Sequence, residues 1–342
     1  MQVIRRIGTH SGTFHADEVT GMMMLKNFVT EFQNAEIIRT RDPAILSTLD
    51  LIIDVGGEYN HQLRRYDHHQ KGFSETFSDQ HKTKLSSAGL IFKHYGEEIL
   101  RNTLNHIFEF EQTIDKKHNV DLSLDDLVAL KNLMYNDFVE YIDGVDNGIT
   151  QYPKEIMPKY KSQYTDLCSR ISRLNNRSVS KEAQSQDELF FKAMAIAKED
   201  FVYEVTNKFV DKYIGVSIVK EAFSKRKNIH ESGKIIYIES SCSWKEALSK
   251  LEKAEAAEEQ TLFVLYHDKL DGNYRVQAVP LAQGSFELRC GLKEEWRGLR
   301  DEELEKINGI PGSVFCHING FIGVGTTFEC VLEMAKQSLP SV

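Results

Sequence analysis

Cysteine pairs, long apolar runs and an excess of positive charge are all missing from this sequence. The 5 cysteines include no Cys-x-x-Cys pair, which argues against a zinc ribbon or a disulfide framework and favours a reducing, intracellular compartment. No apolar run reaches the length of about 18 residues that a membrane span requires. The formal net charge of −9 excludes a broad basic surface for nucleic acid, although a few local cations could still bind one strand end.

Proline is also scarce, at 6 of 342 residues, and long Ser/Gly-rich tracts are missing. Hydrophobic residues make up 41% of the chain, so a sizeable core can form, and the length predicts two domains. The first residues lead directly into a group of polar side chains, so we expect no targeting peptide. The expected location is the cytoplasm or nucleus, with the mitochondrion left open.

The first part of the chain alternates between apolar strands and helices. Three strands are expected, at residues 3–9, 36–40 and 51–54. The last is continuously apolar, as in a strand that is buried on both faces. Helices between these strands predict a parallel sheet with helices on its faces. Further helices are expected at residues 86–95, 104–116 and 124–141.

The second part begins after a long helical pattern at residues 189–214, where apolar side chains recur every three or four positions. Strands are expected at 215–219 and 234–238, a helix at 244–259, a hairpin from 261–266 and 274–279, and a last helix ending at Ser338. The predicted fold is α/β, with an N-terminal domain built on a parallel β-sheet flanked by helices (1–186), a long connector helix (187–214) and a smaller C-terminal α/β domain with a mixed sheet (215–342).

Histidine and aspartate gather in three segments that lie far apart in the sequence. These segments are 10–18, the Asp67-His68-His69 triplet and 143–148. Asp54 ends the apolar strand between the first two segments. Because ligands at the carboxyl ends of parallel strands line the crevice of an open α/β sheet, we expect these groups to converge.

Imidazole and carboxylate ligands together suit manganese, iron, cobalt or zinc better than calcium or magnesium. Two such cations about 3.5–4 Å apart hold a bridging hydroxide beside a phosphate, and Asp54 is the expected bridging ligand. The candidate ligands are His10, His15, Asp17, Asp54, His68 and Asp143. Two alternatives stay open: Asp146 competes with Asp143, and acids at 17 and 18 also suit the dipole of a first helical turn.

These segments resemble a known superfamily. Asp54, the Asp67-His68-His69 triplet and Asp143 are similar to the DHH phosphoesterases, which include RecJ-type exonucleases, oligoribonucleases, cyclic-dinucleotide phosphodiesterases and family II inorganic pyrophosphatases. Within that superfamily, six segments resemble the melanocyte-proliferating-gene family across nearly the whole chain: 8–18, 66–70, 85–90, 141–148, 296–301 and 320–323.

The resemblance implies a 3′–5′ exonuclease that acts on RNA or a short oligonucleotide through two divalent ions. Manganese is the expected ion, with magnesium, cobalt or zinc as alternatives. One ion would be held by His10, His15 and Asp54. The other would be held by Asp17, Asp54, His68 and Asp143, and the resemblance favours Asp143 over Asp146.

The resemblance also assigns the remaining members of the triplet. His69 would donate to the phosphate or the leaving oxygen, and Asp67 would orient His68 or His69. The first loop of the superfamily usually reads His-x3-Asp-x-Asp. His15 stands near the first of those acids here, which lowers the negative charge at the first metal.

In the second domain, His317 and three glycines precede a helix, at Gly320, Gly323 and Gly325. Glycine lets backbone N–H groups approach an anion, and a helix N-terminus favours negative charge, although a purely structural turn fits as well. The resemblance favours binding of a substrate phosphate or sugar. Arg275 is a further substrate-binding candidate, alongside Arg289, Arg297 and Arg300.

Two other functions are compatible with the same residues. One is hydrolysis of a small substrate such as pyrophosphate, a cyclic dinucleotide or a short oligonucleotide. The other is a non-catalytic metal-binding scaffold, in which filled ligand shells leave no open position. Assembly into a homodimer is left open.

Overall fold

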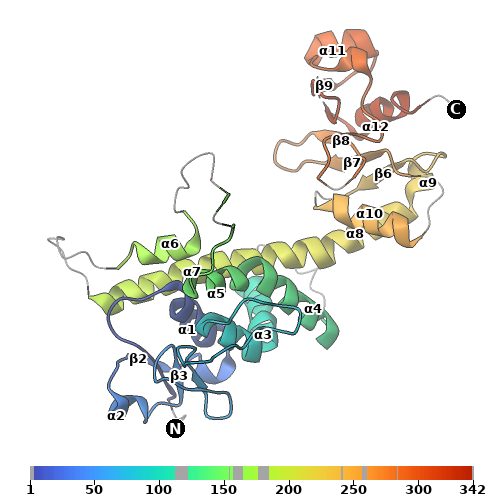
Figure 1. The fold of residues 1–342 in the computed structure, drawn as a ribbon. Helices are drawn as coiled ribbons and strands as arrows, with labels where there is room; N and C mark the ends of the chain where they lie inside the picture. The colour runs from blue at the N-terminus through green and yellow to red at the C-terminus, as the bar shows by residue number, and fades with distance from the viewer. Residues whose placement is uncertain are drawn as a thin grey trace. The chain divides into compact units, whose positions relative to one another are not determined.

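The computed structural model describes residues 4–111, 122–153, 155–156, 165–175, 185–239, 242–255, 260–282 and 284–340. They form two compact units, Met1–Lys208 and Phe209–Val342. Each unit contains a five-stranded mixed sheet with helices, so the α/β class is confirmed (Figure 1). None of the helices in the described ranges combines the length and apolar character needed to cross a bilayer.

The sheet of the first unit has the strand order β2-β1-β3-β5-β4. Its strands are β1 (Arg6–Thr9), β2 (Glu36–Arg39), β3 (Leu51–Ile53), β4 (Tyr59–Asn60) and β5 (Arg65–Tyr66). All neighbours pair parallel except β4, which runs antiparallel to β5 at the edge. The three expected strands are confirmed. The pair β4 and β5 escaped prediction because two-residue strands are too short to show alternation.

Strand β3 is covered on both faces, as its apolar run predicts. On one face Ile52 packs with Leu46 and Leu49, close to α2 (Pro43–Leu46). On the other face Ile53 approaches α1 so closely that a Cβ on Gly21 would lie 3.0 Å from it. Successive side chains of a strand point to opposite faces, and both faces of β3 are covered. Asp54, which directly follows β3, is therefore buried as well.

The helices between Ala16 and Phe209 follow the expected segments with shifted ends. They are α1 (Ala16–Phe28), η1 (Thr30–Phe32), α2, α3 (Ser87–His106), η2 (Ile107–Glu111), α4 (Leu124–Met134), η4 (Tyr135–Val139), α5 (Glu140–Asp146), α6 (Leu167–Ser172) and α7 (Gln186–Phe209). The helix expected at 104–116 is the end of α3 and η2, and residues 112–116 lie outside the described part. Helix α1 packs against α3 (Figure 1).

The second unit contains η5 (Val210–Ile214), α8 (Gly215–Ser224), α9 (Arg226–Ile229), β6 (Ile235–Ile238), α10 (Trp244–Ala254), β7 (Phe263–His267), β8 (Tyr274–Ala278), η6 (Glu294–Trp296), α11 (Asp301–Asn308), β9 (Ser313–Cys316), β10 (Ile322–Gly325) and α12 (Phe328–Gln337). The sheet order is β6-β7-β8-β10-β9, with β6 and β7 parallel and the other pairs antiparallel. The expected mixed sheet, hairpin and last helix are confirmed.

One expected strand of the second unit is wrong. Residues 215–219 begin α8 instead of forming a strand. The β-branched run favours a strand locally, but the buried side chains of this segment follow helical spacing. Val219, Ala222 and Phe223 pack together against strand β6 and helix α10. Tertiary packing therefore overrides the local preference.

Candidate metal centre

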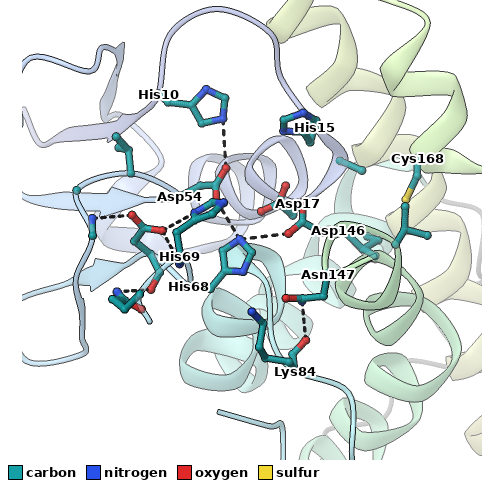
Figure 2. Close-up of a pocket in the computed structure, with 18 of the residues that line it drawn as sticks. His10, His15, Asp17, Asp54, His68, His69, Lys84, Asp146, Asn147 and Cys168 are labelled. Carbon is teal, nitrogen blue, oxygen red and sulfur yellow. Dashed lines mark hydrogen bonds and ion pairs between the residues drawn. The ribbon is translucent and has the colours of Figure 1, made fainter. Parts of the chain in front are cut away.

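The site lies where three parallel strands end. Strands β1, β3 and β5 are neighbours, and the residues that follow them are His10, Asp54 and the triplet 67–69. Parallel strands bring their carboxyl ends to one edge of the sheet, so these side chains meet there. They line a pocket of about 940 Å³ together with Asp17 of α1 and Asp146 of α5 (Figure 2).

Asp54 occupies the centre of this group. Its Oδ2 lies 3.2 Å from His10 Nε2, and its Oδ1 lies 3.2 Å from His68 Nε2. Figure 2 shows the carboxylate between the two imidazoles. Asp54 has a φ of 56°, in the left-handed region that aspartate tolerates better than most residues, and its N–H donates to Tyr66 O at 3.0 Å. Each oxygen of the Asp54 carboxylate thus faces a different histidine, as is required of a carboxylate that bridges two cations.

Glu18 is a member of the site that sequence reasoning assigned only to the helix dipole. It is fully buried, and its Oε1 lies 3.1 Å from His10 Nε2. Its carboxylate also accepts from the backbone N–H of His15, which closes the capping box of α1. Ligand atoms of His10, His15, Glu18 and Asp54 lie within 4.8 Å of one another. The acid therefore serves both the helix start and the ligand cluster.

Two further clusters overlap the first. Asp54, His68 and His69 form one of them, and His15, Asp17 and Asp146 form the other. His68 Nε2 also lies 3.2 Å from Asp146 Oδ2. The clusters share Asp54 and His15, so they form one continuous group of candidate ligands.

Asp143 is not brought into this group. Its buried carboxylate accepts hydrogen bonds from Ser86 N–H, Ser86 Oγ–H, Gly89 N–H and Tyr135 O–H. Those donors saturate the carboxylate and join α5 to the start of α3. Asp146, one turn further along α5, faces the pocket instead. Residues three apart share one face of a helix, so the partners of the two acids and not their spacing separate them: Asp143 is occupied by donors of α3 and η4, whereas Asp146 lies 3.2 Å from His68 Nε2. This geometry favours Asp146 over the expected Asp143, and the ligand role of either acid stays a prediction.

The donor set fits divalent cations. Among the candidate ligands, four buried atoms make no hydrogen bond within the described residues: Asp17 Oδ1, Asp54 Oδ1, His68 Nδ1 and His68 Nε2. Buried polar atoms are nearly always satisfied in folded proteins, and an unsatisfied one costs free energy. Orphaned carboxylate and imidazole atoms that converge on one pocket are the ligands expected for manganese, iron, cobalt or zinc.

Crowding of acids gives the centre an unusual proton distribution. Burial and the neighbouring charge of Asp17 raise the pKa of Asp146 to about 8, and the same two causes raise the pKa of Glu18. Burial opposes the charged forms of Asp54 and His10 as well, but contacts with histidines lower the pKa of Asp54 to about 2. Contacts with Asp54 and Glu18 raise the pKa of His10 to about 10 despite its burial. The raised pKa values thus keep protons on His10, Glu18 and Asp146, at positions where the surrounding carboxylates favour positive charge.

His69, which belongs to the cluster with Asp54 and His68, also pairs with Asp67. His69 Nδ1 lies 2.7 Å from Asp67 Oδ1, and a carboxylate only accepts, so Nδ1 carries the proton. Asp67 also accepts from the N–H groups of His69 and Gly57. Asp67 is buried, whereas 63% of the His69 side chain is exposed. Asp67 therefore orients His69, and the other ring nitrogen of His69 is left for a ligand in the pocket.

The pocket lining also includes Arg41, Lys84 and Cys168, which the sequence did not mark as site residues. Arg41 donates from Nε to Ser11 O at 3.3 Å. Burial, followed by the charge of Asp166, raises the pKa of the Cys168 thiol to about 12. Arg41 follows β2 and Lys84 precedes α3. Neither segment contains a motif that would have predicted these residues in the pocket.

Comparison with known proteins identifies the family. The family model MYG1_exonuc, described as uncharacterised protein family UPF0160, matches residues 6–339. The chain belongs to the MYG1 exonuclease family. Its resemblance to the melanocyte-proliferating-gene family is therefore confirmed.

Relatives in this family match along nearly the whole chain. MYG1 exonuclease of Rattus norvegicus is 41% identical, over 98% of this chain and 84% of the rat protein. MYG1 exonuclease of Homo sapiens is 40% identical, over 98% and 85%. MYG1 protein of Dictyostelium discoideum is 40% identical, over 97% and 96%. A RecJ structure with Mn²⁺ from Thermus thermophilus is 13% identical, over 98% of this chain and 53% of its own, with a TM-score of 0.24.

In this MYG1-family chain, the glycines of the second unit have packing roles. Gly323 and Gly325 lie within β10, so the expected glycine-rich loop is wrong at these positions. A Cβ on Gly323 would lie 2.8 Å from Met334 Cε, and one on Gly325 would overlap Cys330 Sγ. Both glycines let α12 approach the sheet. Gly320 lies in the turn before β10 with a φ of 67°.

Two further candidates of the second unit, Arg275 and His317, have protein partners. Arg275 of β8 forms ion pairs with Asp268 and Asp271. His317 follows β9, and its Nδ1 accepts from the N–H of Asn319 at 3.1 Å. Substrate binding by these residues and by the glycines stays a prediction.

Proposed function

We propose that this chain is a metal-dependent 3′–5′ exoribonuclease that uses a dinuclear centre. The observation that carries the proposal is Asp54, whose two oxygens face different histidines inside a group of converging, unsatisfied ligand atoms. Membership in the MYG1 family supports it, because the rat and human relatives are named exonucleases and match over 98% of this chain. Manganese is the proposed ion.

Two ligand sets follow from the overlapping clusters. The first comprises His10, His15 and Asp54, with Glu18 beside them as a further carboxylate. The second comprises Asp17, Asp54, His68 and Asp146, with Asp146 in place of Asp143. Bound there, two divalent cations would neutralise phosphate charge and activate water for attack on phosphorus.

Outside the ligands, this chain contributes proton transfer and positive charge. Asp67 orients His69 by accepting from its Nδ1, and the other ring nitrogen of this exposed side chain would meet a phosphate oxygen or the leaving oxygen. Arg41 and Lys84 line the same pocket and would meet the flanking phosphates. The chain has a net charge of −9, and few positive side chains line the pocket. Such a site suits one end of a nucleic-acid strand better than a long duplex.

The proposal is tested by supplying Mn²⁺ and a short RNA labelled at either its 5′ or its 3′ end. We expect stepwise loss of mononucleotides from the 3′ end, so the 5′ label stays on a shrinking ladder. Pyrophosphate and a cyclic dinucleotide serve as competing substrates in parallel reactions. The proposal is contradicted if the RNA stays intact with every divalent metal supplied, or if either small substrate is turned over faster than RNA.

Asp54→Asn is the matched site variant. The amide keeps the size of the carboxylate but loses the charge that both cations would share. We expect turnover to fall by more than about 100-fold, beyond the 10–100-fold typical of outer partners. Circular dichroism should remain unchanged, which separates ligand loss from misfolding. Turnover close to the wild-type rate would refute the bridging role.

A further inference from the structure

The loop between β1 and α1 carries two proposed ligands, His10 and His15, and a distant side chain holds its backbone. Phe14 lies in this loop, directly before His15. Asn175, just beyond α6, accepts from Phe14 N–H at 3.0 Å and donates from Nδ2 to Phe14 O at 2.9 Å. One amide side chain thus pairs with both backbone groups of one residue, in the manner of a neighbouring β-strand.

Packing around Phe14 and a second contact in the loop support the pairing between Phe14 and Asn175. The Phe14 side chain is fully buried and packs edge-on against Phe190 of α7, with ring centroids 5.6 Å apart. Buried backbone groups need partners, and Asn175 satisfies both groups of Phe14. Arg39 holds the preceding part of the loop by donating to Gly12 O at 2.6 Å. The loop therefore has a fixed backbone path immediately before His15.

We propose that Asn175 is a positioning residue for the first metal subsite. Its amide fixes the peptide units on both sides of Phe14, and the second of them leads directly to His15 and the start of α1. His15 is an exposed side chain, so its direction depends on the backbone beneath it. This inference rests on the proposed function, because it assigns Asn175 a role in holding the cation.

Two variants separate the two hydrogen bonds from side-chain size. Asn175→Ala removes both bonds. Asn175→Asp keeps the size and the acceptor but places a second oxygen against Phe14 O. In both we expect Mn²⁺ affinity, measured by calorimetry, to fall about 10–100-fold, as for other partners that orient a ligand. We expect excess Mn²⁺ to restore most of kcat at a temperature well below melting.

Asn102→Ala is the matched control. Asn102 of α3 donates to Phe28 O at 2.9 Å, so it holds the opposite end of α1 by the same kind of bond. We expect this variant to lose stability while its Mn²⁺ affinity stays unchanged. That contrast distinguishes positioning of the metal site from a general contribution to folding.

The outcomes are separable. Weakened Mn²⁺ binding in both Asn175 variants, with normal binding in Asn102→Ala, supports the positioning role. Binding as tight as wild type in Asn175→Ala and Asn175→Asp overturns it and leaves the proposed function standing. Equal weakening in Asn102→Ala also overturns it. A wild-type protein that binds no Mn²⁺ overturns both the function and the inference.

Discussion

At the scale of single residues, neighbouring acids of one helix have different tasks. Asp143 and Asp146 both belong to α5, and both were candidate ligands. Asp143 accepts four hydrogen bonds in the core, whereas Asp146 lies 3.2 Å from His68 at the pocket. Burial raises the pKa of each acid, to about 7 for Asp143 and about 8 for Asp146. Neighbouring partners, and not burial alone, therefore distinguish a structural acid from a proposed ligand.

Alanine at each position should separate these tasks. Asp143→Ala leaves four buried donors without an acceptor, so we expect a loss of about 2–4 kcal/mol in the free energy of unfolding. Asp146→Ala removes a proposed ligand from a crowded acidic group, so we expect stability within about 1 kcal/mol of wild type and a large loss of turnover. Denaturant titration and RNA hydrolysis measure the two effects. Comparable stability losses in both variants would contradict the division.

At the scale of elements, helices α3 and α5 meet where no side chain fits between them. Gly89 lies in the first turn of α3 and donates its N–H to Asp143. A Cβ on Gly89 would overlap Asp143 Oδ2. The hydrogen bonds that hold the carboxylate prevent it from moving aside. The junction therefore requires glycine for space, not for an unusual backbone angle.

Gly89→Ala should lower the free energy of unfolding by about 2 kcal/mol or more, as expected for an overpacked core. Gly144→Ala is its control, because Gly144 lies in α5 with nothing within 4 Å of an added Cβ. Alanine is the better helix former by about 0.5–1 kcal/mol, so the control should be neutral or more stable. Chemical denaturation measures both. A stable Gly89→Ala protein would refute the close approach.

A stacked pair of histidines joins the β4 region to α3. The rings of His61 and His94 are parallel, with centroids 3.8 Å apart, and Tyr59 O–H lies 2.8 Å from His94 Nε2. Burial lowers the pKa of His94 from 6.5 to about 4, assisted by the nearby charges of His61, Lys93 and Lys131 and opposed by Glu75. The fold therefore favours a neutral His94.

This histidine should make stability pH-dependent. Between pH 6.5 and pH 4 the unfolded chain binds a proton at His94 that the folded chain does not, so stability falls as the pH falls through this window. Allowing for partial exposure, we expect the wild type to lose about 2 kcal/mol more than His94→Gln. Urea titrations at pH 7 and pH 4.5, without added metal, give the difference. An equal loss in both proteins would contradict the assignment.

At the scale of the whole molecule, every proposed metal ligand belongs to one unit. The ligands lie between His10 and Asp146, all within Met1–Lys208. The second unit has its own buried core on both faces of its sheet. Helices α8 and α10 cover one face and α12 packs on the other, so this unit does not depend on metal for its core.

Metal binding should therefore leave a local signature. We expect Mn²⁺ to slow amide hydrogen exchange in peptides that cover 10–18, 52–57, 65–70 and 140–147, because bound ions stabilise only the folded site. Peptides from the hairpin of β7 and β8 should exchange at an unchanged rate. Mass spectrometry with and without Mn²⁺ reads both sets. Protection confined to the hairpin would place the metal elsewhere.

The sequence by itself determined the α/β class, the three strands that lead to the site, most helices and the identity of most proposed ligands. These features depend on local patterns: apolar runs, helical spacing and the rarity of Asp-His-His at a strand end. Its resemblance to the MYG1 family was likewise carried by short motifs. The β-branched run at 215–219 misled because packing, which is not local, decided its helical form.

Only the tertiary structure decided which acid of α5 faces the pocket, that Glu18 lies beside His10 among the proposed ligands and that Asn175 pairs with the loop. The Phe14–Asn175 pair joins positions 161 residues apart, and no local pattern marks such a partner. A carboxylate looks the same in the sequence whether it accepts four hydrogen bonds in the core or faces a cation. Its role is set by the groups that the fold brings within about 3 Å, which is the range of hydrogen bonds and metal coordination.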